Sequence, residues 1–128
     1  MPELSNRPLG DLELAVMEVL WQRAPMSVKD VTSALSARSL AYTTVMTTLD
    51  RLHKKGLLDR DKQGHAFLYR PAMDRITYER RLIAGLLGDL PMASREALLS
   101  GFLDYAATDS AALDTLERLI AERKQEQP

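Results

Sequence analysis

The chain has 128 residues, of which 45% are hydrophobic and 27% are charged, and it contains no cysteine. This length suits one compact fold, or a small head followed by a helical tail. The lack of cysteine excludes disulfides, thiolate nucleophiles, iron–sulfur clusters and cysteine-based zinc sites, and leaves His53 and His65 as the only imidazoles. We therefore expect no metal and no other cofactor.

Charge is distributed unevenly, although the net charge is only −1. Residues 38–70 carry seven basic and three acidic side chains, whereas residues 73–128 carry seven basic and ten acidic ones. The basic excess favours an anionic partner for the first segment, with ordinary surface charge as the alternative. Neither a signal peptide nor a long apolar stretch is present, so we expect a cytoplasmic protein with no membrane insertion.

The pattern of apolar residues predicts two helices near the N-terminus. Helical spacing extends over about residues 10–23, and Pro25 ends it. Ser27 followed three residues later by Asp30 is typical of a helix N-cap, and it predicts a second helix that runs to about Arg38.

A third helix and a hairpin are expected next. The helix covers about residues 42–55 and ends at Gly56, a suitable C-terminal cap. Two short β-compatible runs, 57–61 and 66–70, flank a turn at residues 62–65. The apolar stripe of the third helix consists of Val45, Leu49 and Leu52.

The remaining chain predicts three more helices. The first covers about residues 74–88, Pro91 follows as a break, and Asp109 or Ser110 caps the last helix. We therefore predict a mainly α fold with a small β-hairpin wing: a winged helix-turn-helix DNA-binding head, 1–72, and a helical dimerisation tail, 73–128. The tail has too few aromatic residues for a strong core of its own. Pairing with a second copy is our preferred interpretation, and packing against the head is the alternative.

The third helix presents a polar face opposite its apolar stripe. On this face Arg51 can donate two hydrogen bonds to a guanine, and Lys54 and Lys55 can attract phosphates. A solvated face whose lysines complement the helix dipole is the alternative interpretation. The candidate DNA-binding residues of the helix are Tyr42, Thr43, Thr44, Met46, Thr47, Arg51, Lys54 and Lys55.

The hairpin strengthens the DNA-binding interpretation, since a basic turn directly after such a helix suits a wing. Arg60 and Lys62 can contact phosphates, whereas Asp59 and Asp61 would be repelled by them. No carboxylate pair, Ser/His/Asp set or glycine-rich phosphate loop can be assembled, so we expect no catalytic residue and no enzyme.

Two stretches of sequence carry a family resemblance. They are Leu9-Gly10-Asp11-Leu12-Glu13 with Val16-Met17 and Leu20-Trp21, and Ala41-Tyr42-Thr43-Thr44-Val45-Met46-Thr47 with Arg51-Leu52-His53-Lys54-Lys55-Gly56. Over about residues 8–125 the chain resembles the penicillinase and methicillin-resistance repressors, the BlaI/MecI family. The resemblance implies a homodimer that occupies an inverted-repeat DNA operator and blocks transcription, with β-lactam-responsive genes as candidate targets.

The resemblance also assigns roles to single residues. Thr44, Met46, Thr47 and Arg51 would face bases or adjacent phosphates, with Lys55 and Lys62 on the DNA backbone. Relatives are commonly induced when a membrane sensor-protease responds to a β-lactam and the repressor is cut before a phenylalanine. The matching position here is Gly101-Phe102, where the best-known members have asparagine first. The candidate dimerisation residues are Leu99, Phe102, Leu113, Leu116 and Ile120.

Two other functions are considered. A winged-helix protein-interaction module predicts an apolar or acidic face on the third helix, against the observed Thr/Arg/Lys face. A ligand-gated regulator predicts a pocket between head and tail, with Met73, Tyr78, Leu82 and Tyr105 as its candidate lining.

Overall fold

A computed structural model describes residues 8–90 and 95–127, so the expected break at Pro91 lies outside the described residues. The chain forms two compact units, Met1–Gly88 and Asp89–Pro128. The first unit contains the elements α1 (Asp11–Gln22), β1 (Met26–Ser27), α2 (Val28–Ala34), η1 (Ser36–Arg38), α3 (Tyr42–Lys54), β2 (Leu58–Gln63), β3 (Ala66–Pro71) and α4 (Arg75–Gly88). The second contains α5 (Arg95–Ala106) and α6 (Ser110–Glu126).

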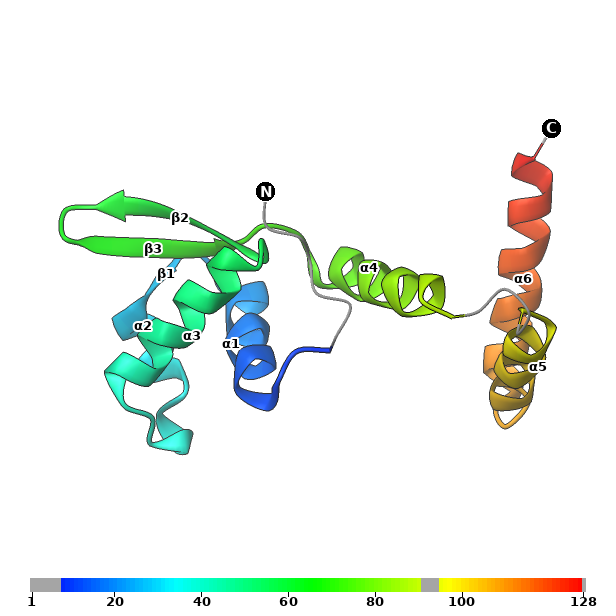
Figure 1. The fold of residues 1–128 in the computed structure, drawn as a ribbon, viewed down its shortest axis with the longest axis horizontal. Coiled ribbons are helices and arrows are strands. Elements are labelled where there is room, and N and C mark those ends of the chain that lie inside the picture. The colour runs from blue at the N-terminus through cyan, green and yellow to red at the C-terminus, as the bar shows by residue number, and fades with distance from the viewer. Residues whose placement is uncertain (1–7, 91–94, 128) are drawn as a thin grey trace. The chain divides into compact units, whose positions relative to one another are not determined.

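The first unit combines helices with a three-stranded antiparallel sheet in the order β1-β3-β2. The β2–β3 hairpin extends past the helices as a wing (Figure 1). Gly64 has a φ of 62° in the two-residue turn, a conformation that glycine adopts without steric cost. The predicted fold class, mainly α with a small β-hairpin wing, is confirmed.

The N-cap predicted for the second helix is confirmed. The Asp30 backbone N–H donates to Ser27 Oγ at 3.1 Å, and the Ser27 N–H donates to Asp30 Oδ2 at 3.1 Å. This reciprocal pair satisfies two N–H groups that the helix leaves unbonded. The expected length is wrong, because α2 ends at Ala34 and the chain tightens into the 3-10 turn η1.

The end of α3 follows the Gly56 signal. Gly56 has a φ of 84°. Its N–H donates to the His53 carbonyl, and the Leu57 N–H donates to the Leu52 carbonyl, both at 3.0 Å. This is the pairing of a Schellman motif, which turns the chain from the helix directly into β2.

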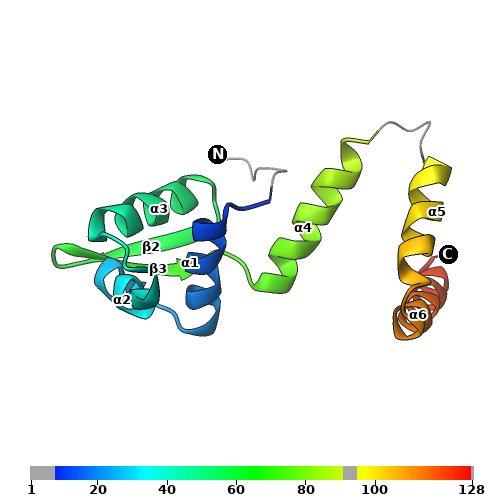
Figure 2. The same cartoon turned by 90° about the horizontal axis from the view of Figure 1, so that it is seen from below.

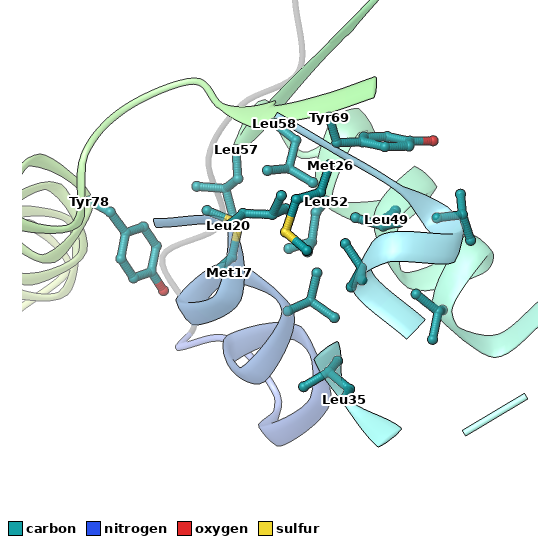
Figure 3. Close-up of a cluster of buried hydrophobic side chains, with 14 residues drawn as sticks. Met17, Leu20, Met26, Leu35, Leu49, Leu52, Leu57, Leu58, Tyr69 and Tyr78 are labelled. Carbon is teal, nitrogen blue, oxygen red and sulfur yellow. The ribbon is translucent and has the colours of Figure 1, made fainter. Parts of the chain in front are cut away.

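The core of the first unit lies between its helices and the sheet. Met17 and Leu20 from α1 meet Leu49 and Leu52 from α3 under Tyr69 of β3 (Figure 3), and all five side chains are at most 2% exposed. The Val45, Leu49 and Leu52 stripe is therefore buried as predicted. Burial of this stripe fixes which face of α3 remains available to a partner.

The start of α4 belongs to the same unit. Trp21 Nε1 donates to the Met73 carbonyl at 3.0 Å, and the Trp21 and Tyr78 rings lie 5.7 Å apart. The compact unit therefore continues past residue 72, where we expect the DNA-binding domain to end. The assignment of binding and dimerisation to the two parts stays a prediction.

The second unit is a pair of helices with little interior. The Ala111 N–H donates to Asp109 Oδ1 at 3.0 Å, so Asp109 caps α6. Among the described residues of this unit only Ala106 is buried, whereas Leu99 and Tyr105 are 61% and 78% exposed. A helix pair that leaves its large apolar side chains in water gains little from its own packing.

Candidate nucleic-acid interface

The outward face of α3 carries the residues that the sequence singles out. Val45, Leu49 and Leu52 turn inward, which leaves Thr43, Thr47 and their polar neighbours on the opposite side. Tyr42 and Met46 remain 52% and 42% exposed. The exposed members of the predicted set are Tyr42, Thr43, Thr44, Met46, Thr47, Arg51 and Lys54.

The three cations of this helix have different surroundings. Arg51 is exposed and forms no ion pair with any described residue. Lys54 Nζ lies 2.9 Å from Asp50 Oδ2 one turn away, and its side chain stays 75% exposed. Lys55 Nζ lies 2.7 Å from Glu13 Oε2 of α1, with the two side chains only 31% and 12% exposed. Arg51 and Lys54 are thus better placed for DNA than Lys55.

The Glu13–Lys55 pair ties the start of α1 to the end of α3. Glu13 also accepts the Gly10 backbone N–H at 3.2 Å. Burial raises the pKa of the Glu13 carboxyl, but the hydrogen bonds from Lys55 and Gly10 outweigh it and hold the pKa below its ordinary value of 4.5. Contact of Lys55 with a DNA phosphate, expected from the family resemblance, would compete with this pair and stays a prediction.

Acidic and basic side chains alternate along β2 of the wing. Lys62 is exposed on β2. Asp61, expected to be repelled by DNA, pairs with Arg70 on the neighbouring strand β3. Arg60 instead contacts Asp50 of α3, with 3.2 Å between Nη1 and Oδ1. The hydrogen bond from Lys54, together with that from Arg60, holds the pKa of Asp50 below its ordinary value of 3.8, against the effect of burial.

A groove of about 800 Å³ runs between α3 and the hairpin. Figure 2 shows α3 alongside β2, the strand that carries Arg60. The groove is lined from α3 by Tyr42, Met46, Thr47 and Asp50, from the hairpin by Arg60, His65, Ala66, Phe67 and Tyr69, and from β1 and the start of α2 by Ser27, Val28 and Lys29. Three of the candidate DNA-binding residues, Tyr42, Met46 and Thr47, line this groove, and the other six do not: Thr43, Thr44, Arg51, Lys54, Lys55 and Lys62.

Some of this surface was not found from the sequence. Asp50 is not among the residues predicted from the sequence, although it stands four residues before Lys54, the spacing of a helical ion pair. Its contact with Arg60 carries no local signal, because it forms only when the hairpin folds back along α3. Thr48 is not part of this surface: it is only 4% exposed, and its hydroxyl donates to the Thr44 carbonyl at 2.8 Å.

The other candidate residues do not line this groove. Met73, Tyr78 and Leu82 pack against the core of the first unit, and Tyr105 belongs to the second. Gly101 and Phe102 are exposed within α5. Leu113 and Leu116 are half-buried, whereas Ile120 is 48% exposed. Over residues 8–90 and 95–127, no three metal-ligating side chains come together and no helix has the length and apolarity to span a bilayer.

Comparison with known families decides the relationship. The family model described as "Penicillinase repressor" matches residues 9–122. The chain belongs to the penicillinase repressor family. The resemblance found in the sequence is therefore confirmed.

Members of the penicillinase repressor family with curated names are similar over most of the chain. The "Transcriptional regulator BlaI" of Mycobacterium tuberculosis is 45% identical over 121 residues, which cover 89% of this chain and 83% of that protein. The "Penicillinase repressor" of Bacillus licheniformis is 28% identical over 117 residues, 91% of each chain. The solution structure of the DNA-binding domain of the repressor BlaI matches with a TM-score of 0.50 and 34% identity, over 56% of this chain and 89% of that one.

Proposed function

We propose that this protein is a transcriptional repressor that binds an inverted-repeat DNA operator as a homodimer. The observation that carries the proposal is the polar face of α3, which borders a groove with the wing in a member of the penicillinase repressor family. The solved relative with 34% identity is a repressor's DNA-binding domain. The named relatives are regulators of transcription rather than enzymes, so the proposal gives this chain no catalytic step.

In this proposal α3 enters the major groove. Arg51 donates to a guanine edge, Thr43, Thr44 and Thr47 contact bases or phosphates, and Met46 contacts a thymine methyl. Lys54 and Lys62 bind phosphates on the two sides of the DNA major groove, and Tyr42 contacts a phosphate near the start of α3. The proposed site of action is the cytoplasm.

Dimerisation through the second unit completes the proposal. Exposed Leu99, Phe102 and Ile120, together with half-buried Leu113 and Leu116, supply apolar surface that a second copy can bury. Two-fold symmetry then places the two copies of α3 about one helical turn of DNA apart. Cleavage between Gly101 and Phe102 by a membrane sensor-protease or a protease acting after it is the proposed route of induction, and it requires α5 to unwind locally.

The test is selection of duplexes from a randomised library by the full-length protein, followed by footprinting at two salt concentrations. The expected result is one enriched two-fold-symmetric sequence, protected against excess random DNA. Sequence-indifferent retention that disappears as salt rises would contradict operator recognition. Absence of DNA binding at both salt concentrations would favour a protein-interaction module.

A further inference from the structure

Arg60 lies on β2 near the base of the wing, and its guanidinium is engaged on three sides. Nη1 lies 3.2 Å from Asp50 Oδ1 and 3.5 Å from the Tyr69 hydroxyl oxygen. The guanidinium carbon lies 4.3 Å from the centroid of the Phe67 ring. The Arg60 side chain is 27% exposed. These contacts engage Nη1 and one face of the guanidinium within the protein.

The strand register explains this arrangement. Arg60 is paired with Tyr69 and Lys62 with Phe67, so Arg60 and Lys62 share one face of the hairpin. Phe67 is the diagonal neighbour of Arg60, within reach of a long side chain. Arg60 can therefore lie along the strand over the ring while its Nη1 meets Asp50 of α3. Lys62 on the same face is exposed.

We propose that Arg60 is a positioning residue that fixes the wing to the recognition helix through Asp50 and does not itself bind a phosphate. This inference rests on the proposed DNA-binding function and replaces the expectation that Arg60 contacts the DNA backbone. Asp50 belongs to α3 and Arg60 to β2, so their contact sets the direction in which the hairpin leaves the helix. That direction determines whether Lys62 and the exposed face of α3 reach the same duplex.

The guanidinium is needed for this role because of its shape. A planar group can stack on Phe67 and donate in its own plane to Asp50 and Tyr69 at once. The ammonium of a lysine keeps the charge and serves well on a phosphate, but it cannot reproduce that combination. Arg60→Lys therefore separates positioning from phosphate binding.

The experiment measures affinity for the library-selected duplex as a function of salt, with full-length Arg60→Lys and Arg60→Gln proteins. Lys62→Gln, on the same face of the same strand, is the matched comparison. Both Arg60 variants are expected to bind about threefold to tenfold more weakly, the scale of a partly exposed charged contact. Their slopes of log affinity against log salt stay at the wild-type value. Lys62→Gln loses about 1.8 from that slope, because each of the two copies in the dimer gives up one phosphate contact worth about 0.9.

Other outcomes overturn the inference. Wild-type affinity in Arg60→Lys, with a slope loss of about 1.8 in Arg60→Gln for the two copies in the dimer, would make Arg60 a phosphate contact. Wild-type affinity in both variants would leave it with no role in binding. Thermal unfolding checks that each variant is folded, and Phe67→Leu gives a second route, because it removes the ring and keeps the charge. Phe67→Leu is expected to weaken binding with an unchanged slope. Failure of the unaltered protein to bind any duplex would overturn the proposed function first, and this inference with it.

Discussion

The two units of this protein differ in how far their apolar side chains are buried. In the first unit, side chains from α1, α3 and the sheet converge in one core, and Val16, Val31 and Leu49 are 0% exposed. In the second unit, Leu99, Leu103 and Tyr105 remain more than half exposed. Apolar surface stabilises a fold only where it leaves water. The first unit can therefore be stable alone, whereas the second is expected to depend on a partner surface.

The largest expected effect compares one leucine from each unit. Leu49→Ala should lower the free energy of unfolding by about 2–5 kcal/mol, because it leaves a cavity in a closed core. This loss should be the same at every protein concentration. Leu99→Ala should destabilise mainly in concentrated samples, where the unaltered chain is dimeric, because the stability that dimerisation adds disappears in samples too dilute for a dimer. Denaturant unfolding at two protein concentrations, followed by the single tryptophan and by circular dichroism, measures both effects; a concentration-independent Leu99→Ala would contradict a partnered second unit.

Charge on the apolar face of α6 tests the partner directly. Leu116→Glu with Ile120→Glu should give monomers and weak operator binding, because two carboxylates would be buried without partners. Gln125→Glu, at an exposed position about 180° from Leu116 and about 140° from Ile120 around the helix, is the matched control and should remain dimeric. Sedimentation equilibrium measures the mass of each variant. A persistent dimer in the double variant would place the interface elsewhere.

The binding face of the first unit should lose specificity when its exposed arginine is truncated. Arg51→Ala should cost on the order of 1–3 kcal/mol of operator binding and relax the preference at one base pair. Lys54→Ala should weaken binding to all sequences alike and reduce the salt slope by about 1.8, since each copy in the dimer loses one phosphate contact. Library selection repeated with each variant distinguishes the two. Unchanged specificity in Arg51→Ala would mean that the arginine holds only phosphate.

The pH dependence of the first unit should carry the signature of Glu13. Because its pKa is held below 4.5 in the folded state, Glu13 stabilises the fold above that pH, and the contribution is lost as pH falls through the lowered pKa. Glu13→Gln should therefore cost on the order of 1 kcal/mol at neutral pH. Unfolding curves of the two proteins should converge in acid. If the difference in free energy of unfolding between the two proteins stayed constant down to acid pH, the Glu13–Lys55 pair would not be its source.

The smallest expected effect concerns Gly101 within α5. A Cβ built there meets no atom within 4 Å, and glycine disfavours a helix interior. Gly101→Ala should stabilise the second unit by about 0.5–1 kcal/mol and slow proteolysis after residue 101, because local unwinding costs more. Timed digestion with mass spectrometry checks this. Loss of the dimer in Gly101→Ala would instead place this glycine at a close helix–helix contact.

Local sequence signals were sufficient for most of the first unit. Ser27 with Asp30 located the start of α2, and the Val45, Leu49 and Leu52 period identified the inward face of α3. Gly56 located the end of that helix. Each signal acts within about one helical turn, since hydrogen bonds at helix ends and the 3.6-residue period are local. The outward face of α3, and so the candidate site, followed directly.

Contacts between distant elements were decided only by the tertiary structure. The two-residue strand β1 is too short to show a period, and it exists because Met26 pairs with Tyr69. The Glu13–Lys55 and Asp50–Arg60 contacts depend on how α1 and the hairpin pack against α3. The sequence determined which charges the chain carries. The packing decided which of them are paired within the protein and which, like Arg51 and Lys62, remain exposed, because an ion pair requires a geometry that only the folded chain provides.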